Sequence, residues 1–186
     1  TDMSGGAIGE SLILDFTKYM NKLIDFEVAE PDALVQVLGS PRDYARLDHS
    51  QEHAGTTTIT VEPGMFYRDF EKITLEKNMI LPCYTASKDL NAMGGMYGNN
   101  SGGERTLKYG QVQDFAIEAK AIFSDGNEYV VKQLTEEELK NKITQNDFEG
   151  DIYKNIYELI KNNQEEIKNA KPKVHKNSAG YYLWNV

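Results

Sequence analysis

The chain has 186 residues, a formal net charge of −9 at pH 7 and one cysteine, Cys83. This length is enough for one sizeable domain or two small subdomains without a metal or disulfide staple, and a lone cysteine excludes an internal disulfide. The acidic balance, without a basic stripe, excludes nucleic acid as the main partner. Because no apolar run approaches the roughly 20 residues that span a bilayer, and TDMSGG lacks signal-peptide features, we expect no transmembrane segment and a cytoplasmic location.

Strands and helices alternate in the pattern of the first half of the chain. Residues 11–16, SLILDF, predict a strand, and PDALVQVLG within residues 30–46 predicts a helix that begins at a proline and ends at a glycine. Residues 56–63, TTTITVEP, alternate β-branched side chains and predict a strand followed by a Pro-Gly turn. Residues 65–78 predict an amphipathic helix. Its apolar positions at helical spacing are Phe66, Phe70, Ile73 and Leu75.

The second half of the chain predicts a hairpin and then helices. FAIEAKAIF at residues 115–123 and EYVVKQL after the turn SDGN have the pattern of two antiparallel strands. Thr135 and Glu138 predict a capping box for the helix TEEELKNKI. Isoleucines at helical spacing predict packing helices over residues 151–168. Aromatic residues return in KNSAGYYLWNV, which predicts a C-terminal segment that docks onto the rest.

Two glycine-rich loops, TDMSGGAIG at the start and AMGGMYGNNSGG within residues 81–114, are the strongest functional signal. Glycine loses much conformational entropy and buries no side chain, so such density indicates positive φ angles or close approach to a ligand. Successive N–H groups in such a loop can bind a phosphate. Neither loop matches the GxGxxG or GxxxxGK[ST] pattern. A purely structural role of the glycines remains the alternative.

The order TDMSGG, ITVEPGMFYRDFEK, MGGMYGNNSGG, KYGQVQD and SDGNEY resembles the FAD-binding domain of FAD-linked oxidases of the vanillyl-alcohol oxidase or PCMH type. In pattern it is most similar to the D-lactate dehydrogenase and glycolate oxidase group, over most of residues 1–131. The resemblance implies an α+β fold of two small α+β subdomains with FAD between them. Residues 1–55 would end the first subdomain, with an insertion at about 26–55. Residues 56–134 would form the second, and 135–186 a helical extension with a docking segment.

The resemblance also assigns cofactor-binding positions. In the pyrophosphate loop Thr1, Ser4 and Gly5 match, whereas Asp2 and Met3 depart from the family pattern. Thr1 and Ser4 would donate to the pyrophosphate, glycines would let the backbone approach the cofactor, and an asparagine side chain would add hydrogen bonds. The other positions that the resemblance assigns to FAD binding are Pro82, Ser87, Gly94, Gly95, Asn100, Gly102, Gly103, Tyr109, Gly110 and Asp114.

The activity implied is oxidation of a 2-hydroxy acid such as D-lactate or glycolate, with hydride transfer to the flavin and an electron-acceptor partner protein. Substrate residues in this family lie largely in a cap domain that the chain lacks, so catalytic residues are not assigned. Because the chain starts with Thr1 directly in a Ser/Gly loop, we expect an excised piece that is inactive alone. Two alternatives are a non-catalytic FAD-binding subunit of a multi-subunit oxidase and a UDP-N-acetylenolpyruvoylglucosamine reductase-like flavoenzyme.

The histidine, cysteine and C-terminal aromatic residues are expected to have surface or packing roles. His49 and His53 lie four apart in a polar segment without a third ligand, so we expect an exposed loop and no metal site. His175 lies in a basic turn and is expected at the surface. Cys83, beside a proline of the flavin-facing loop, would at most neighbour the cofactor. Packing is the expected role of Tyr181, Tyr182 and Trp184.

Overall fold

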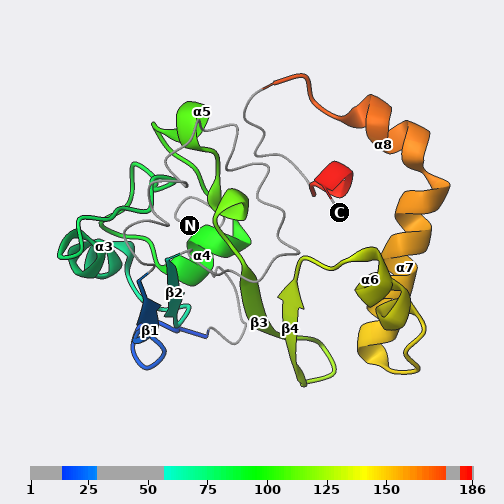
Figure 1. The fold of residues 1–186 in the computed structure, drawn as a ribbon, viewed down its shortest axis with the longest axis horizontal. Helices are drawn as coiled ribbons and strands as arrows, with labels where there is room; N and C mark the ends of the chain where they lie inside the picture. Colours follow the sequence, from blue (N-terminus) through cyan, green and yellow to red (C-terminus); the bar gives the residue numbers. More distant parts are fainter. Residues whose placement is uncertain (1–13, 29–56, 175–180, 186) are drawn as a thin grey trace, which may run out of the picture. The chain divides into compact units, whose positions relative to one another are not determined.

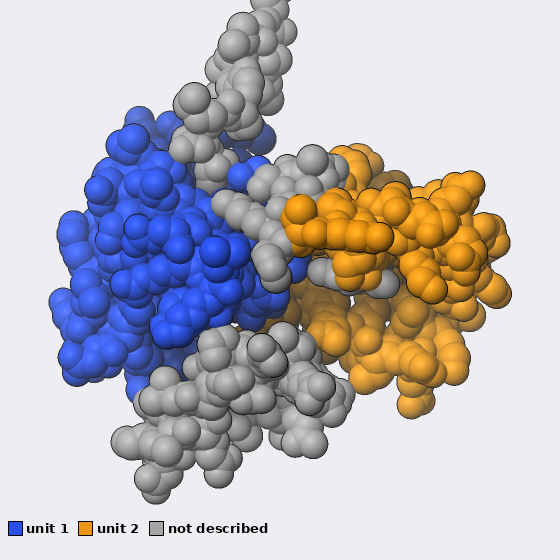
Figure 2. All heavy atoms as spheres, turned by 90° about the horizontal axis from the view of Figure 1, so that it is seen from above, with its two compact units in different colours: residues 1–116 blue, residues 117–186 orange. Residues whose placement is uncertain are grey.

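Helices and short antiparallel strand pairs alternate along the chain, so the fold is α+β (Figure 1). The computed structural model describes residues 14–28, 57–174 and 181–185. The chain divides into two compact units, residues 1–116 and 117–186 (Figure 2). The subdomain limits expected from the resemblance stay a prediction.

The first unit contains one antiparallel strand pair. β1 (Leu23–Glu27) pairs with β2 (Thr58–Val61), with Phe26 opposite Ile59 and an irregularity between Leu23 and Asp25. β2 confirms the strand predicted over residues 56–63, and a turn at 63–64 follows it as expected.

The strand predicted at residues 11–16 is wrong in its described part, since residues 14–16 are not in a strand. The Asp15 carboxylate instead accepts from the N–H of Thr17 at 2.9 Å and from its hydroxyl at 2.6 Å. The N–H of Met20 then donates to the carbonyl of Phe16. An aspartate that bonds the backbone two residues on favours a turn over an extended strand. The chain therefore turns here, and the strand begins later, at Leu23.

Helix α3 (Tyr67–Leu75) confirms the amphipathic helix expected over residues 65–78. Its buried face is formed by Tyr67, Phe70 and Thr74, at the i, i+3 and i+7 spacing of one helix face. Leu75, expected on that face, is 54% exposed because it lies one position beyond the stripe. The buried apolar residues of the core are Met65, Tyr67, Phe70, Cys83, Tyr84, Met96 and Val112.

The central glycine-rich segment is partly helical, which differs from the loop expected. It contains α4 (Met93–Gly98), α5 (Thr106–Tyr109) and a 3₁₀ turn, η1 (Val112–Asp114). Glycine disfavours a helix by about 1 kcal/mol relative to alanine, yet tertiary contacts override propensity. In α4 the Met96 side chain is 1% exposed and anchors the helix in the core.

The second unit begins with the predicted hairpin, which is confirmed. β3 (Glu118–Ile122) and β4 (Glu128–Lys132) pair antiparallel, with Ala121 opposite Tyr129. In the turn, Gly126 has φ +83°. The rings of Phe123 and Tyr129 stack at 4.9 Å beside it.

Three helices follow the hairpin. The predicted capping box is present at α6 (Glu136–Ile143), where Thr135 and Glu138 bond each other's backbone N–H groups. The helical pattern of residues 151–168 belongs to two helices, α7 (Phe148–Asn162) and α8 (Gln164–Ala170). They break at Asn163, whose side-chain amide donates to the carbonyl of Leu159 at 2.7 Å.

The end of the chain packs within the second unit. A short 3₁₀ turn, η2 (Leu183–Asn185), contacts α8. The rings of Tyr182 and Trp184 lie 5.1 Å apart, as expected for packing residues, whereas Tyr181 is 89% exposed. Among the helices that the structure describes, none is long and apolar enough to cross a membrane.

Several expectations fall on residues outside the described ranges. They are the helix within residues 30–46, most of the insertion at 26–55, and the residues Thr1, Ser4, Gly5, His49, His53 and His175.

Candidate functional site

The turn after β2 and the start of α4, two motifs far apart in the sequence, are in direct contact. The N–H of Gly94 donates to the carbonyl of Pro63 at 2.8 Å, and that of Met93 donates to the carbonyl of Met65 at 2.8 Å. A Cβ added at Gly94 would lie 2.5 Å from the Cβ of Pro63. The close approach that the structure describes at Gly94 is therefore to Pro63, while the next glycine, Gly95, is exposed.

Asn100 ends the α4 turn in the left-handed region, with φ +42°. Its side-chain amide donates to Gln113 Oε1 at 2.8 Å, and its Oδ1 accepts from the Gln113 N–H at 3.0 Å. Its carbonyl accepts from the Gln111 side chain at 2.8 Å. The amide that the resemblance assigns to FAD is thus held by two bonds to Gln113, which fix its orientation.

Gly102 and Gly103 lie where other backbone and side-chain atoms approach closely. The N–H of Gly103 donates to Thr106 Oγ1 at 2.8 Å, and the Thr106 N–H donates back to the Gly103 carbonyl at 3.1 Å. A Cβ at Gly103 would overlap the carbonyl oxygen of Tyr84, and one at Gly102 would overlap Thr106 Oγ1. The pair joins the loop at 82–87 to α5.

The Tyr-Gly…Asp pattern forms a cap. Gly110 has φ +88°, and a Cβ there would overlap the Asp114 carboxylate. Asp114 Oδ2 accepts from the Gln111 N–H at 2.7 Å and so caps η1. A hydrogen bond with Lys108 lowers the pKa of Tyr109. The close contact between Gly110 and the Asp114 carboxylate therefore gives a structural reason for both residues.

Ser101 is held from both sides and carries an unsatisfied hydroxyl. Its N–H donates to the carbonyl of Met96 at 2.9 Å, and its own carbonyl accepts from the N–H of Val112 at 3.0 Å. The residue is 3% exposed, and its buried Oγ has no hydrogen-bond partner among the described residues. An unsatisfied buried polar group costs about 1–3 kcal/mol. No sequence motif had singled out this residue.

The loop with Pro82 and Ser87 covers the core of the first unit. Pro82 and Ser87 are half-buried, and the Ser87 hydroxyl lies 3.0 Å from that of Thr85. Cys83 is fully buried, and burial raises the pKa of its thiol to about 12. This cysteine is therefore an inert packing residue at neutral pH.

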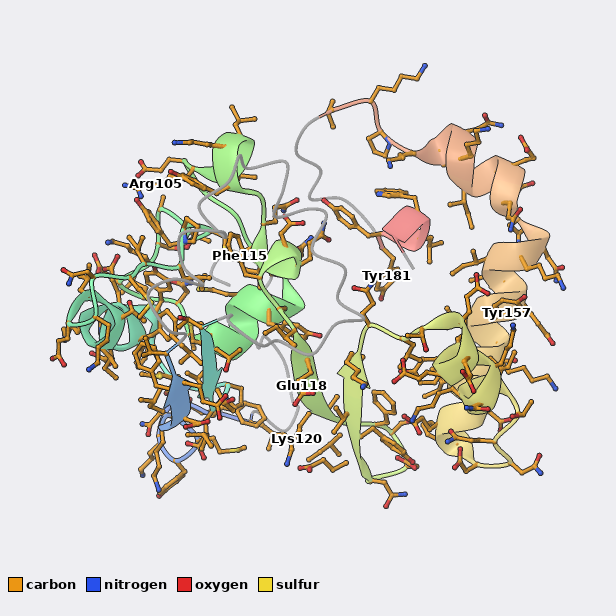
Figure 3. The ribbon with its side chains drawn as sticks, viewed as in Figure 1. Arg105, Phe115, Glu118, Lys120, Tyr157 and Tyr181 are labelled. Carbon is orange, nitrogen blue, oxygen red and sulfur yellow. The ribbon has the colours of Figure 1, made fainter. Side chains whose placement is uncertain are left out.

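Tyr84 organises a charged cluster that the sequence pattern did not indicate. Its hydroxyl donates to Glu104 Oε1 at 2.9 Å, and this bond raises the pKa of Tyr84. The Lys88 ammonium and the Arg105 guanidinium lie 5.0 and 5.4 Å from its ring centre. Lys88 also pairs with Glu71 at 2.8 Å. Figure 3 labels Arg105, just before α5. The cluster ties the loop at 82–87 to α3 and to the start of α5.

The ten assigned residues within the described ranges all belong to one continuous stretch, 82–114. Hydrogen bonds within this stretch join Asn100 to Gln113, Gly103 to Thr106 and Asp114 to Gln111. Across the described ranges, no group of three or more His, Cys, Asp or Glu side chains could hold a metal ion.

The comparison with protein families identifies this region. The family described as FAD binding domain matches residues 43–132. This part of the chain is similar to the FAD-binding domains of FAD-linked oxidases. The match supports an FAD-binding domain of the PCMH type and indicates FAD as the cofactor.

Two curated proteins are similar to this chain. Glycolate oxidase subunit GlcD of Bacillus subtilis (strain 168) is 33% identical over 70 residues, which are 38% of this chain and 15% of that protein. D-2-hydroxyglutarate dehydrogenase of Escherichia coli (strain K12) is 19% identical over 186 residues, the whole of this chain and 16% of that protein. The chain therefore spans only about a sixth of the length of either relative. No solved structure matches significantly.

The residues of the FAD-binding domain are chemically suited to the cofactor. A dinucleotide with two phosphates needs main-chain donors, small residues at its surface and few competing charges. Gly95 and Gly98 are exposed, and a Cβ at Gly98 would have no neighbour within 4 Å, so α4 presents open backbone there. The Ser101 hydroxyl, buried and without a partner among the described residues, lies nearby in the chain.

Proposed function

We propose that the chain is the cofactor-binding part of an FAD-dependent oxidoreductase that oxidises a 2-hydroxy acid of the D-lactate or glycolate type. The observation that carries this proposal is the chemistry named in both relatives, glycolate and D-2-hydroxyglutarate. Each of these acids has a hydroxyl on the carbon next to a carboxylate. The proposal extends this shared substrate class to the protein that contains the present chain.

The proposed binding roles follow from position and donor chemistry. Thr1, Ser4 and Gly5 would hold the pyrophosphate with hydroxyl and main-chain donors. The exposed Gly95 would let the cofactor approach the α4 backbone, which Gly94 fixes against the turn after β2. The remaining members of the proposed set are Pro82, Ser87, Asn100, Gly102, Gly103, Tyr109, Gly110 and Asp114.

Within this set, some residues would contact the cofactor and others would support the shape of the loop. The exposed backbone of α4 and the half-buried loop at 82–87 would meet the cofactor. Asn100 and Asp114, which bond the backbone of Gln113 and Gln111, would hold the loop in shape. Bound FAD would supply the acceptor for the hydride that leaves the C2 carbon of the substrate. We place the substrate and acid–base groups in a further cap domain, and FAD between the two proposed subdomains, 1–55 and 56–134.

The first test is FAD uptake by the chain. Purified protein would be mixed with FAD, freed of unbound cofactor by gel filtration and scanned for the flavin absorption bands. We expect FAD to remain bound in about a one-to-one ratio. A chain that stays colourless after this treatment would contradict the proposed FAD site.

The second test addresses the substrate in the longer protein that contains this chain. Anaerobic addition of D-lactate, glycolate or D-2-hydroxyglutarate should bleach the flavin absorption, while the isolated chain with FAD should show no bleaching. L-Lactate is the matched control because it differs from D-lactate only in configuration. Absence of bleaching with every 2-hydroxy acid would contradict the proposed substrate class.

A subunit role is the second candidate, because one relative is by its name a subunit of glycolate oxidase. In that case the protein would bind FAD but show no oxidation of 2-hydroxy acids until partner chains were added. Flavin bleaching that appears only in a reconstituted mixture would favour this candidate.

A further inference from the structure

Ser101 carries a buried hydroxyl that has no hydrogen-bond partner in the part of the chain that the structure describes, and the proposed FAD site does not yet use it. The residue is 3% exposed and lies between α4 and α5. Buried hydroxyl groups in folded proteins are nearly always satisfied. The missing partner at this position therefore requires an explanation.

The backbone around Ser101 cannot easily move to supply that partner. Its N–H is bonded to the carbonyl of Met96 at 2.9 Å, and its carbonyl is bonded by the N–H of Val112 at 3.0 Å. These two bonds tie the residue to α4 on one side and to η1 on the other. The side chain retains one freedom, rotation about χ1 between staggered positions.

The neighbours of Ser101 in the chain belong to the loop proposed to bind the cofactor. Asn100 precedes it with φ +42°, and Gly102 and Gly103 follow it. A Cβ at Gly102 would overlap Thr106 Oγ1 and one at Gly103 would overlap the carbonyl oxygen of Tyr84, so the loop is closely packed. The backbone of this loop is therefore preorganised for a polar ligand, and rotation of the Ser101 side chain about χ1 is the one adjustment that binding would require.

We propose that the Ser101 hydroxyl is a hydrogen-bonding group for FAD and obtains its partner when the cofactor is bound. This inference rests on the proposed FAD site. It predicts an unusual pair of effects for the substitution Ser101→Ala. Removal of an unsatisfied hydroxyl should not destabilise the free chain, whereas removal of a cofactor contact should weaken FAD binding.

The experiment compares Ser101→Ala with wild type in the full 186-residue chain. Urea unfolding of the free chain and the Kd for FAD, from quenching of flavin fluorescence, are measured for each protein. We expect Ser101→Ala to leave the unfolding midpoint unchanged or raised, and to raise the Kd for FAD about five- to tenfold, the effect of one hydrogen bond. The matched control Ser124→Ala removes an exposed hydroxyl in the β3–β4 turn and should change neither quantity.

Binding of FMN and ADP shows which half of the cofactor meets the hydroxyl. A weaker FMN complex of Ser101→Ala places the partner on the flavin half, and a weaker ADP complex places it on the adenylate half. An unchanged Kd for FAD would overturn the inference while leaving the proposed function intact. Clear destabilisation of free Ser101→Ala would also overturn it, because the hydroxyl would then have a partner, such as a buried water, without FAD. Failure of the wild-type chain to bind FAD would instead contradict the proposed FAD site itself.

Discussion

At the residue scale, glycine is needed for different physical reasons at different positions of the first unit. Gly110 adopts φ +88°, which other residues rarely adopt, whereas Gly94 is required for space against the ring of Pro63. At Gly98, on the same helix as Gly94, no atom of the described residues lies within 4 Å of the position of the missing Cβ. The sequence shows only that glycine is frequent here, because the space at Gly94 depends on Pro63, about thirty residues away in the chain.

The pair Gly94→Ala and Gly98→Ala tests this distinction within one helix. In Gly94→Ala the new Cβ would lie 2.5 Å from Pro63 Cβ, so we expect a loss of about 1–3 kcal/mol in the free energy of unfolding. Gly98→Ala meets no atom and should be neutral or stabilising by up to about 1 kcal/mol, because alanine favours the helix. Urea unfolding measures both changes. Equal stability of the two variants would contradict the packing role of Gly94.

Cys83 provides a prediction on reactivity and pH. Burial raises its thiol pKa from near 9 to about 12, so the folded protein keeps the thiol protonated where the unfolded chain would ionise. We expect slow alkylation by iodoacetamide at about pH 8 in the native protein and fast alkylation in concentrated urea. The contribution of this group to stability should be complete below about pH 9 and decline as the pH rises toward 12. Rapid labelling of native protein would show that Cys83 is accessible.

At the element scale, structure set by neighbouring residues could be predicted from the sequence. The β3–β4 hairpin and the capping box of α6 are confirmed because their signals, a turn such as SDGN and a Thr135–Glu138 pair, act over a few residues. The strand at 11–16 was wrong, because the Asp15 turn outweighed the apolar pattern. The helix α4 was missed because its stability comes from the buried Met96 and from bonds to the distant turn after β2.

The 3₁₀ turn η1 supplies a prediction at this scale. Asp114→Ala removes the oxygen that accepts from the Gln111 N–H at 2.7 Å, so we expect a loss of about 1 kcal/mol, the usual value of a cap. Asp114→Asn keeps an oxygen at this position and should lose only a small part of that free energy. Thermal unfolding followed by circular dichroism compares the two. If both variants lose equally, the charge of Asp114 matters more than its capping bond.

At the scale of the whole molecule, the candidate site depends on contacts between distant segments. The bridge between Phe66 and Ala92, and the bond from Gly94 to Pro63, join the turn after β2 to α4. The sequence indicated which motifs belong together through the order of a known family. It could not indicate that Asn100 is engaged by Gln113 or that the Ser101 hydroxyl is unsatisfied, because these follow from three-dimensional packing.

Amide hydrogen exchange tests where FAD acts on the chain as a whole. A ligand that binds only the folded state suppresses the openings through which amides exchange, and the effect is largest in the segments that it contacts. We therefore expect FAD to slow exchange most in peptides from residues 82–114. Peptides from α7 and α8 serve as the internal control, because no assigned cofactor position lies in them. NAD⁺ is the matched ligand control, since it shares the ADP half but lacks the flavin. Protection confined to α7 and α8 would contradict the proposed site even if FAD binds, because the cofactor would then lie on the second unit.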